Sequence, residues 1–148
     1  MIIKLTEGDR LIGTLVPTDY YQLVPVKFNE LQKSKSGKSL SMFVDFQISD
    51  GPYKGKDFTV AFNTETNSPS ILGSMVFMPM GFLFNLAAAI LNLPVKDVPQ
   101  DIDTDTLVSK VFDGKIEKTI SDGVPINALL AFLPVGQGAT AAAAKAPF

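Results

Sequence analysis

The chain has 148 residues, 46% of them hydrophobic, and a formal net charge of −2. This length suits one domain with a real core. The absence of histidine and cysteine removes the usual general base, the usual zinc ligands and every thiol nucleophile. We therefore expect a protein that is not an enzyme and has no cofactor. The lack of cysteine fits a reducing cytoplasm, and Met1–Glu7 lacks the pattern of a signal peptide.

The first 19 residues are predicted to form an N-terminal extension of the domain. Within it, Leu11–Val16 is mostly apolar and is a candidate for an additional strand.

Residues 24–63 predict three consecutive strands, because apolar side chains alternate there with other types. One face of each strand should be buried and the other left free. The expected buried positions are Val24, Val26, Phe28, Met42, Val44, Phe46, Ile48, Phe58, Val60 and Phe62. The connections, Lys33–Lys38 and Asp50–Lys56, contain the Gly, Pro, Ser and Asp that turns require.

Basic residues are concentrated in this same region, which predicts one basic face on an otherwise acidic protein. The lysines are Lys27, Lys33, Lys35, Lys38, Lys54 and Lys56, and the acids among them are Glu30, Asp45 and Asp50. An antiparallel meander with cationic turns suits a protein that follows the backbone of a polyanion. The alternative is that these turns are polar only because they lie on the surface.

Asn67–Val95 contains no charged residue and is long enough for a membrane span. Pro79 and Gly81 interrupt it, however, and no basic cluster flanks it. We expect a buried helix over Gly81–Leu93, ended by Pro94. The preceding Ser70–Met80 is predicted to be a loop, a short helix or an oligomer contact.

Val95–Asp105 is acidic and is predicted to be a connecting loop. Its aspartates do not match a calcium loop, since Thr106 and Phe112 stand where glycine and glutamate are needed. We expect Thr104 or Asp105 to cap a short helical turn instead. A metal-dependent nuclease is the enzymatic alternative, and it would use Asp101, Asp103 and Asp105.

Two further strands should close the domain. Phe112, Ile116 and Ile120 share one face of the first, and Ser121–Gly123 forms a turn. Ile126–Leu133 returns as the second strand. Residues 136–148 are rich in alanine and glycine and are predicted to be a flexible tail.

Three strands, a helix and two strands follow the chain order of an OB-fold. We therefore expect a mainly β, five-stranded OB-fold-like barrel over residues 20–135, with the helix between the third and fourth strands. Four motifs carry a resemblance to a known family: K-S-K-S-G-K at 33–38, D-G-P-Y-K-G-K at 50–56, L-V-S-K-V-F-D-G-K-I at 107–116 and A-F-L-P at 131–134. They resemble the OB-fold single-stranded DNA-binding proteins of bacteriophages. Ser109 stands where that family's turn has glycine.

The resemblance implies a viral protein that binds single-stranded DNA without sequence specificity, in the host cytoplasm, during DNA replication or recombination. Such binding needs cations for the phosphates and aromatic rings for the bases. The cationic candidates are Lys27, Lys38, Lys54, Lys56 and Lys115. Phe43 is the best stacking candidate, because the alternation points it away from the buried face. It could instead pack against an N-terminal strand or another subunit. Tyr53 could stack on a base or cover the end of its hairpin.

The chain ends in Pro147–Phe148, as bacterial single-stranded DNA-binding proteins do, although Lys145 and alanines replace their acidic residues. The two residues could recruit replication or recombination proteins, or form a frayed end. Homo-oligomers are compatible with the sequence, and no membrane partner is expected. The alternative function is a structural virion or assembly protein, which would use the barrel and the apolar segment 71–84 for subunit contacts.

Overall fold

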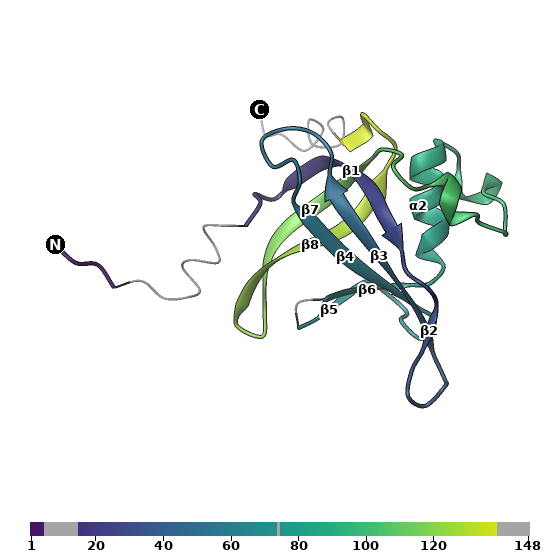
Figure 1. The fold of residues 1–148 in the computed structure, drawn as a ribbon, viewed down its shortest axis with the longest axis horizontal. Helices are drawn as coiled ribbons and strands as arrows, with labels where there is room; N and C mark the ends of the chain where they lie inside the picture. Colours follow the sequence, from purple (N-terminus) through teal and green to yellow (C-terminus); the bar gives the residue numbers. More distant parts are fainter. Residues whose placement is uncertain (5–14, 74, 139–148) are drawn as a thin grey trace.

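In the part of the chain that the structure describes, eight strands form a single sheet that curls into a nearly closed β-barrel (Figure 1). The computed structural model describes residues 1–4, 15–73 and 75–138. The strands are β1 (Asp19–Phe28), β2 (Gln32–Lys33), β3 (Leu40–Ile48), β4 (Asp57–Asn63), β5 (Ser70–Leu72), β6 (Met75–Pro79), β7 (Phe112–Ser121) and β8 (Val124–Leu133). Helix α2 (Phe82–Leu91) and the 3₁₀ turns η1 (Val95–Asp97) and η2 (Thr104–Thr106) lie between β6 and β7 in the chain.

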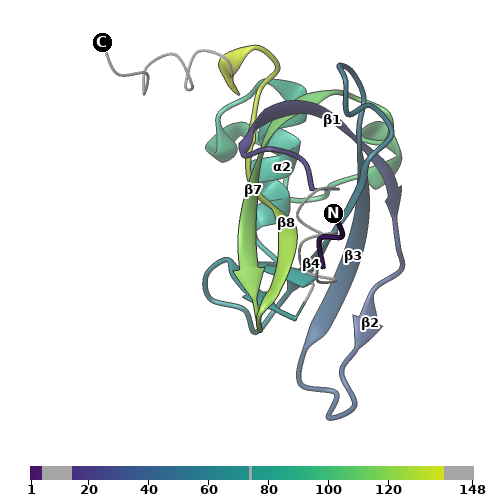
Figure 2. The same cartoon turned by 90° about the vertical axis from the view of Figure 1, so that its left-hand side faces the viewer.

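The sheet has the order β5-β6-β4-β3-β1-β7-β8, and β2 pairs with the start of β3. All neighbours are antiparallel except β4 and β6. Figure 2 shows β1 curving from the side of β7 and β8 to the side of β3 and β4. A mainly β barrel with a helix is thus confirmed.

The expected number of five strands is wrong. The two-residue β2 extends the hairpin that leads into β3, and β5 and β6 come from the apolar segment predicted as a loop, helix or contact. Within β6, Val76 and Met78 are buried while Phe77 points to the other face. This alternation is the mark of a strand with one buried face, although both kinds of position here are apolar.

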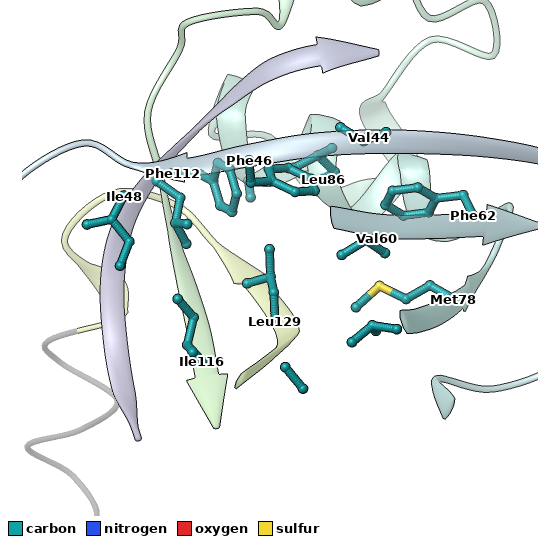
Figure 3. Packing of buried hydrophobic residues seen from close by; sticks show 14 of the residues in the cluster. Val44, Phe46, Ile48, Val60, Phe62, Met78, Leu86, Phe112, Ile116 and Leu129 are labelled. Atoms are coloured by element: carbon teal, nitrogen blue, oxygen red, sulfur yellow. The ribbon is translucent and has the colours of Figure 1, made fainter. Parts of the chain in front are cut away.

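The predicted faces of β3 and β4 are confirmed. Val44, Phe46 and Ile48 are buried on β3, and Val60 and Phe62 on β4. Figure 3 shows these side chains converging with Leu86, Phe112 and others. Met42, Phe28 and Phe58 are partly buried and pack against the same cluster.

The predicted face of β1 is wrong in its first half. Leu23 and Pro25 are buried, whereas Val26 is 48% exposed. The pairing with β3 shifts between Pro25 and Lys27, so Val26 forms a β-bulge. The extra residue returns Phe28 to the core side, opposite Val44.

Helix α2 confirms the helix predicted within Gly81–Leu93. Gly81 precedes its first residue, and Asn92 ends it in the left-handed conformation, two residues before Pro94. Leu86 reaches the barrel core, and Ala87 and Ala88 pack on Val98 and Leu107. Within the described residues, no helix is long and apolar enough to cross a membrane.

The acidic loop contains the predicted short helical turn, but the capping residue differs. Asp103 Oδ1 accepts a hydrogen bond from the Asp105 amide at 3.1 Å, so Asp103 caps η2 rather than Thr104 or Asp105. An aspartate two residues before a free amide can reach it more easily than residues inside the turn. In the ordered loop and the rest of the described chain, no three acidic side chains gather as a metal site requires.

The β7–β8 hairpin closes through Asp122 and Gly123, both with positive φ (50° and 76°), as a two-residue hairpin turn requires. Phe112 and Ile116 are buried as predicted. Ile120 is 70% exposed, against expectation, because the tip of the hairpin extends past the side chains that cover the core.

The segment before β1 is tied to β8 by one side chain. Asn127 accepts a hydrogen bond from the Val16 amide and donates one to the Val16 carbonyl, both at 2.8 Å. Val16 itself is buried in the core. The proposed strand over Leu11–Val16 lies mostly outside the described residues, and Leu15 and Val16 are not in a strand.

Candidate nucleic-acid interface

The outer face of β3, β4 and β6 carries a row of three apolar side chains. Phe43 on β3 lies opposite Ala61 on β4, and Ala61 lies beside Phe77 on β6. Ala61 is completely buried, yet it belongs to neither core cluster, and the half-buried Phe43 and Phe77 do not pack against those clusters either. On this face Ala61 can be buried only by its neighbours, of which the two phenyl rings are the largest. We call Phe43, Ala61 and Phe77 the aromatic row.

Two partly exposed rings on the outside of a barrel can stack on unpaired bases, a contact worth about 1–3 kcal/mol per base. The structure places Phe43 where the sequence predicted it, pointing away from the core. Phe77 was not predicted. No signal in the sequence marked it, because the residues on both faces of β6 are apolar.

A half-buried carboxylate lies next to the aromatic row. Asp45 Oδ1 accepts a hydrogen bond from the Thr59 hydroxyl at 2.7 Å, and Asp45 Oδ2 accepts one from Asn29 Nδ2 at 3.4 Å. Asn29 Nδ2 also donates to the Phe43 carbonyl at 2.8 Å. The exposed Lys27 lies opposite Asp45 in the register of β1 and β3. The predicted cationic residue thus borders this face, whose centre holds an acid.

The two lysine-bearing turns lie at opposite ends of β3. The exposed Lys38 is in the hairpin that precedes β3, and Lys54 and Lys56 are in the turn that follows it. The nine residues of β3 are joined by eight steps of about 3.4 Å, so the strand that separates the turns is about 27 Å long. Figure 1 shows the β2 hairpin projecting from one end of the sheet. The lysines therefore border the outer face at both ends and do not form one cluster.

Lys115 lies farther away, on β7. Its Nζ is 3.3 Å from Glu117 Oε1 and 5.9 Å from the centre of the Tyr20 ring. In the sheet, β1 lies between β7 and β3, and both β1 and β3 lie between β7 and the other two strands of the aromatic row, β4 and β6. The structure does not bring Lys115 together with the other predicted cations, and Glu117 offsets part of its charge.

Tyr53 packs against the barrel core from the β3–β4 turn. Its ring meets that of Tyr21 edge to face, with centroids 6.0 Å apart and an angle of 89°. Burial, together with Asp19 and Tyr53, raises the pKa of Tyr21, whose hydroxyl donates to the Pro17 carbonyl. This packing corresponds to the predicted role of Tyr53 as a cover for the hairpin end.

The start of the predicted tail is bonded to β7. The amides of Gly136 and Gly138 each donate to Asp113 Oδ2 at 2.9 Å, and Asp113 is only 8% exposed. A Cβ atom at Gly138 would lie 2.8 Å from that oxygen, so glycine allows the close approach. Pro147 and Phe148, the predicted docking residues, lie outside the described residues.

Comparison of the chain with protein-family models and with curated proteins finds no match.

Proposed function

We propose that this protein binds single-stranded DNA, without strict sequence specificity, on the outer face of β3, β4 and β6. The observation that carries the proposal is the aromatic row, in which Phe43 and Phe77 flank a buried alanine outside the core. Rings in such positions give little to the stability of the barrel core and are available to stack on bases.

The proposed fold is an OB-fold-like barrel with additions. In this assignment β1, β3, β4, β7 and β8 are the five strands of the OB-fold, while β2, β5 and β6 are extensions. The proposed binding face then corresponds to the second and third OB strands, a face on which OB-folds bind oligonucleotides. Strand β6 widens it and contributes Phe77.

Bases would stack on the two rings while phosphates meet the lysines at the ends of β3. A single OB-fold occupies about 4–16 nucleotides, and a face about 27 Å long is compatible with the lower part of that range. Duplex DNA would bind weakly, because its bases are already stacked and the protein has a net charge of −2.

The resemblance to phage single-stranded DNA-binding proteins supports a role in protecting DNA during phage replication or recombination, in the host cytoplasm. The role requires no catalysis and no cofactor. Replication or recombination proteins are the proposed partners, with Pro147–Phe148 as their contact.

Fluorescence anisotropy with labelled single-stranded and duplex DNA, over a series of salt concentrations, tests this proposal. We expect tight binding to the single strand, weak binding to the duplex and a steep loss of affinity with salt. Absence of single-strand binding at low salt would contradict the proposal.

The double variant Lys54→Ala/Lys56→Ala should lower the slope of log affinity against log salt by about 1.4, since each phosphate contact on a single strand contributes about 0.7. Lys96→Ala is the matched control, because Lys96 is exposed on η1 beyond α2. Unchanged affinity and slope in the double variant would show that these lysines do not contact the DNA.

A structural virion or assembly protein is the second candidate, favoured by apolar side chains at hairpin tips. Ile120 is 70% exposed, Leu72 66% and Val124 46%. Exposed apolar tips are typical of subunit contacts. This candidate predicts ordered assembly in the absence of nucleic acid, which analytical ultracentrifugation would detect.

A further inference from the structure

On the basis of the proposed function, we infer that Asp45 reads the edges of bases held on the aromatic row. It would favour bases that present an amino group, such as cytosine, over those that present a carbonyl in its place, such as uracil or thymine. The protein would then be sequence-tolerant, but not indifferent to base composition.

Asp45 lies on the same outer face as the aromatic row. It is two residues from Phe43 along β3, so both side chains point to the outer face, about 7 Å apart. Thr59, its partner on β4, is likewise two residues from Ala61. A base stacked on Phe43 would therefore direct one of its edges towards the Asp45 carboxylate or away from it.

The carboxylate of Asp45 has unused hydrogen-bonding capacity. An ionised carboxylate only accepts, and it offers about four acceptor positions. Thr59 and Asn29 use two of them, the second with a long contact of 3.4 Å. Within the described ranges, no lysine lies close enough to Asp45 to form an ion pair. About two acceptor positions remain for a ligand that donates.

The negative charge of Asp45 would also limit where the phosphates of a bound strand can lie. A carboxylate repels phosphate, so a strand that crosses this face would keep its phosphates near the lysines at the ends of β3 and its bases near Asp45. Near the middle of the face, a phosphate would have to lie on the side of the exposed Lys27, which is opposite Asp45 in the register of β1 and β3. Asp45 would thereby help to set which side of the strand faces the protein.

The edges of the bases differ in the donors and acceptors that they present. The N4 amino group of cytosine donates to a carboxylate, a recognised pairing of aspartate or glutamate with cytosine. Uracil has the same ring size but carries a carbonyl oxygen there, which would face the carboxylate acceptor to acceptor. An unmatched polar contact costs more than a matched one gains.

The test compares oligo(dC) with oligo(dU) of equal length in a competition titration at pH 8, where cytosine is neutral. The two differ only at the base edge, so differences in stacking area are small. We expect the wild-type protein to prefer oligo(dC) by about fivefold, the lower end of what one base-edge contact gives. Asp45→Asn should bind both oligonucleotides more tightly and lose the preference, since an amide can both donate and accept.

Asp57→Asn is the matched control. Asp57 is exposed at the start of β4 and accepts a hydrogen bond from Gln47 at 3.1 Å. The Asp57→Asn variant loses the same charge as Asp45→Asn but should keep the preference for oligo(dC). Equal binding of both oligonucleotides by the wild type, or an unchanged ratio in Asp45→Asn, would overturn the role of Asp45 while leaving the proposed function intact. Failure of the wild type to bind either oligonucleotide would instead overturn the proposed function.

Discussion

Ser109 has a left-handed backbone, with a φ of 66°, and its amide donates to the Pro25 carbonyl at 2.9 Å. Side chains with a Cβ atom pay about 1–2 kcal/mol for this conformation, whereas glycine costs about 0.5–1 kcal/mol in chain entropy. Ser109→Gly should therefore stabilise the protein by about 0.5–1 kcal/mol in urea unfolding. Ser68→Gly is the control, because Ser68 is an exposed loop serine without positive φ, and it should be slightly destabilising. If Ser109→Gly were no more stable than the wild type, the positive φ would not be a cost to stability at this position.

The two rings of the aromatic row show what could be predicted at the scale of the residue. Phe43 could be assigned to the outer face because its neighbours Met42 and Val44 mark the buried side. Phe77 could not, because Met75 and Pro79, which share its face, are as apolar as the buried Val76 and Met78. Periodicity identifies a face only where the two faces differ in polarity.

At the scale of the element, the sequence predicted β3, β4, helix α2 and the β7–β8 hairpin. The prediction failed where the local sequence does not determine the backbone conformation or the pairing of strands. The bulge at Val26 changes which residues of β1 face the core, and a bulge has no fixed sequence signature. The parallel pairing of β6 with β4 depends on contacts between distant segments, which the alternation of a single strand does not specify.

Strand β7 depends on a glycine where β1, β7 and β8 meet. A Cβ atom at Gly114 would lie 2.3 Å from Leu23 Cδ1 and 2.7 Å from Leu129 Cδ1, and both leucines are buried. Overpacking of this kind costs about 1–3 kcal/mol, so Gly114→Ala should lower the free energy of unfolding by that amount. In the control Gly81→Ala, the new methyl group meets nothing within 4 Å, and stability should change by less than about 0.5 kcal/mol. Wild-type stability of Gly114→Ala would show that the sheet can shift to accept the methyl group.

At the scale of the whole molecule, side chains of the last two strands hold the segments that flank the barrel. Asn127 holds Val16, and Asp113 holds Gly136 and Gly138. Asp113→Ala would remove the carboxylate to which both glycine amides donate, at a cost of about 1–3 kcal/mol. Denaturant unfolding should show this loss of stability. Limited proteolysis should also cleave the chain faster after Leu133. Glu65→Ala, at an exposed loop position, is the control. Unchanged stability and proteolysis in Asp113→Ala would show that water replaces the carboxylate at no cost.

The distribution of charge over the whole molecule follows from the order of strands. The sequence predicted that lysines gather in two turns, and successive hairpins place those turns at opposite ends of β3. In the proposed function, binding would therefore combine distant cations with rings between them, and the rings would discriminate single strands from duplex.

The most direct test of this account is single-strand affinity after removal of both rings. Phe43→Leu/Phe77→Leu keeps apolar side chains beside Ala61 but abolishes stacking. We expect a loss of about 1–3 kcal/mol per ring in binding free energy, with folding retained. Phe28→Leu, on the core side, should keep the affinity of the wild type. A folded double variant that binds single-stranded DNA as tightly as the wild type would show that the aromatic row is not the binding site.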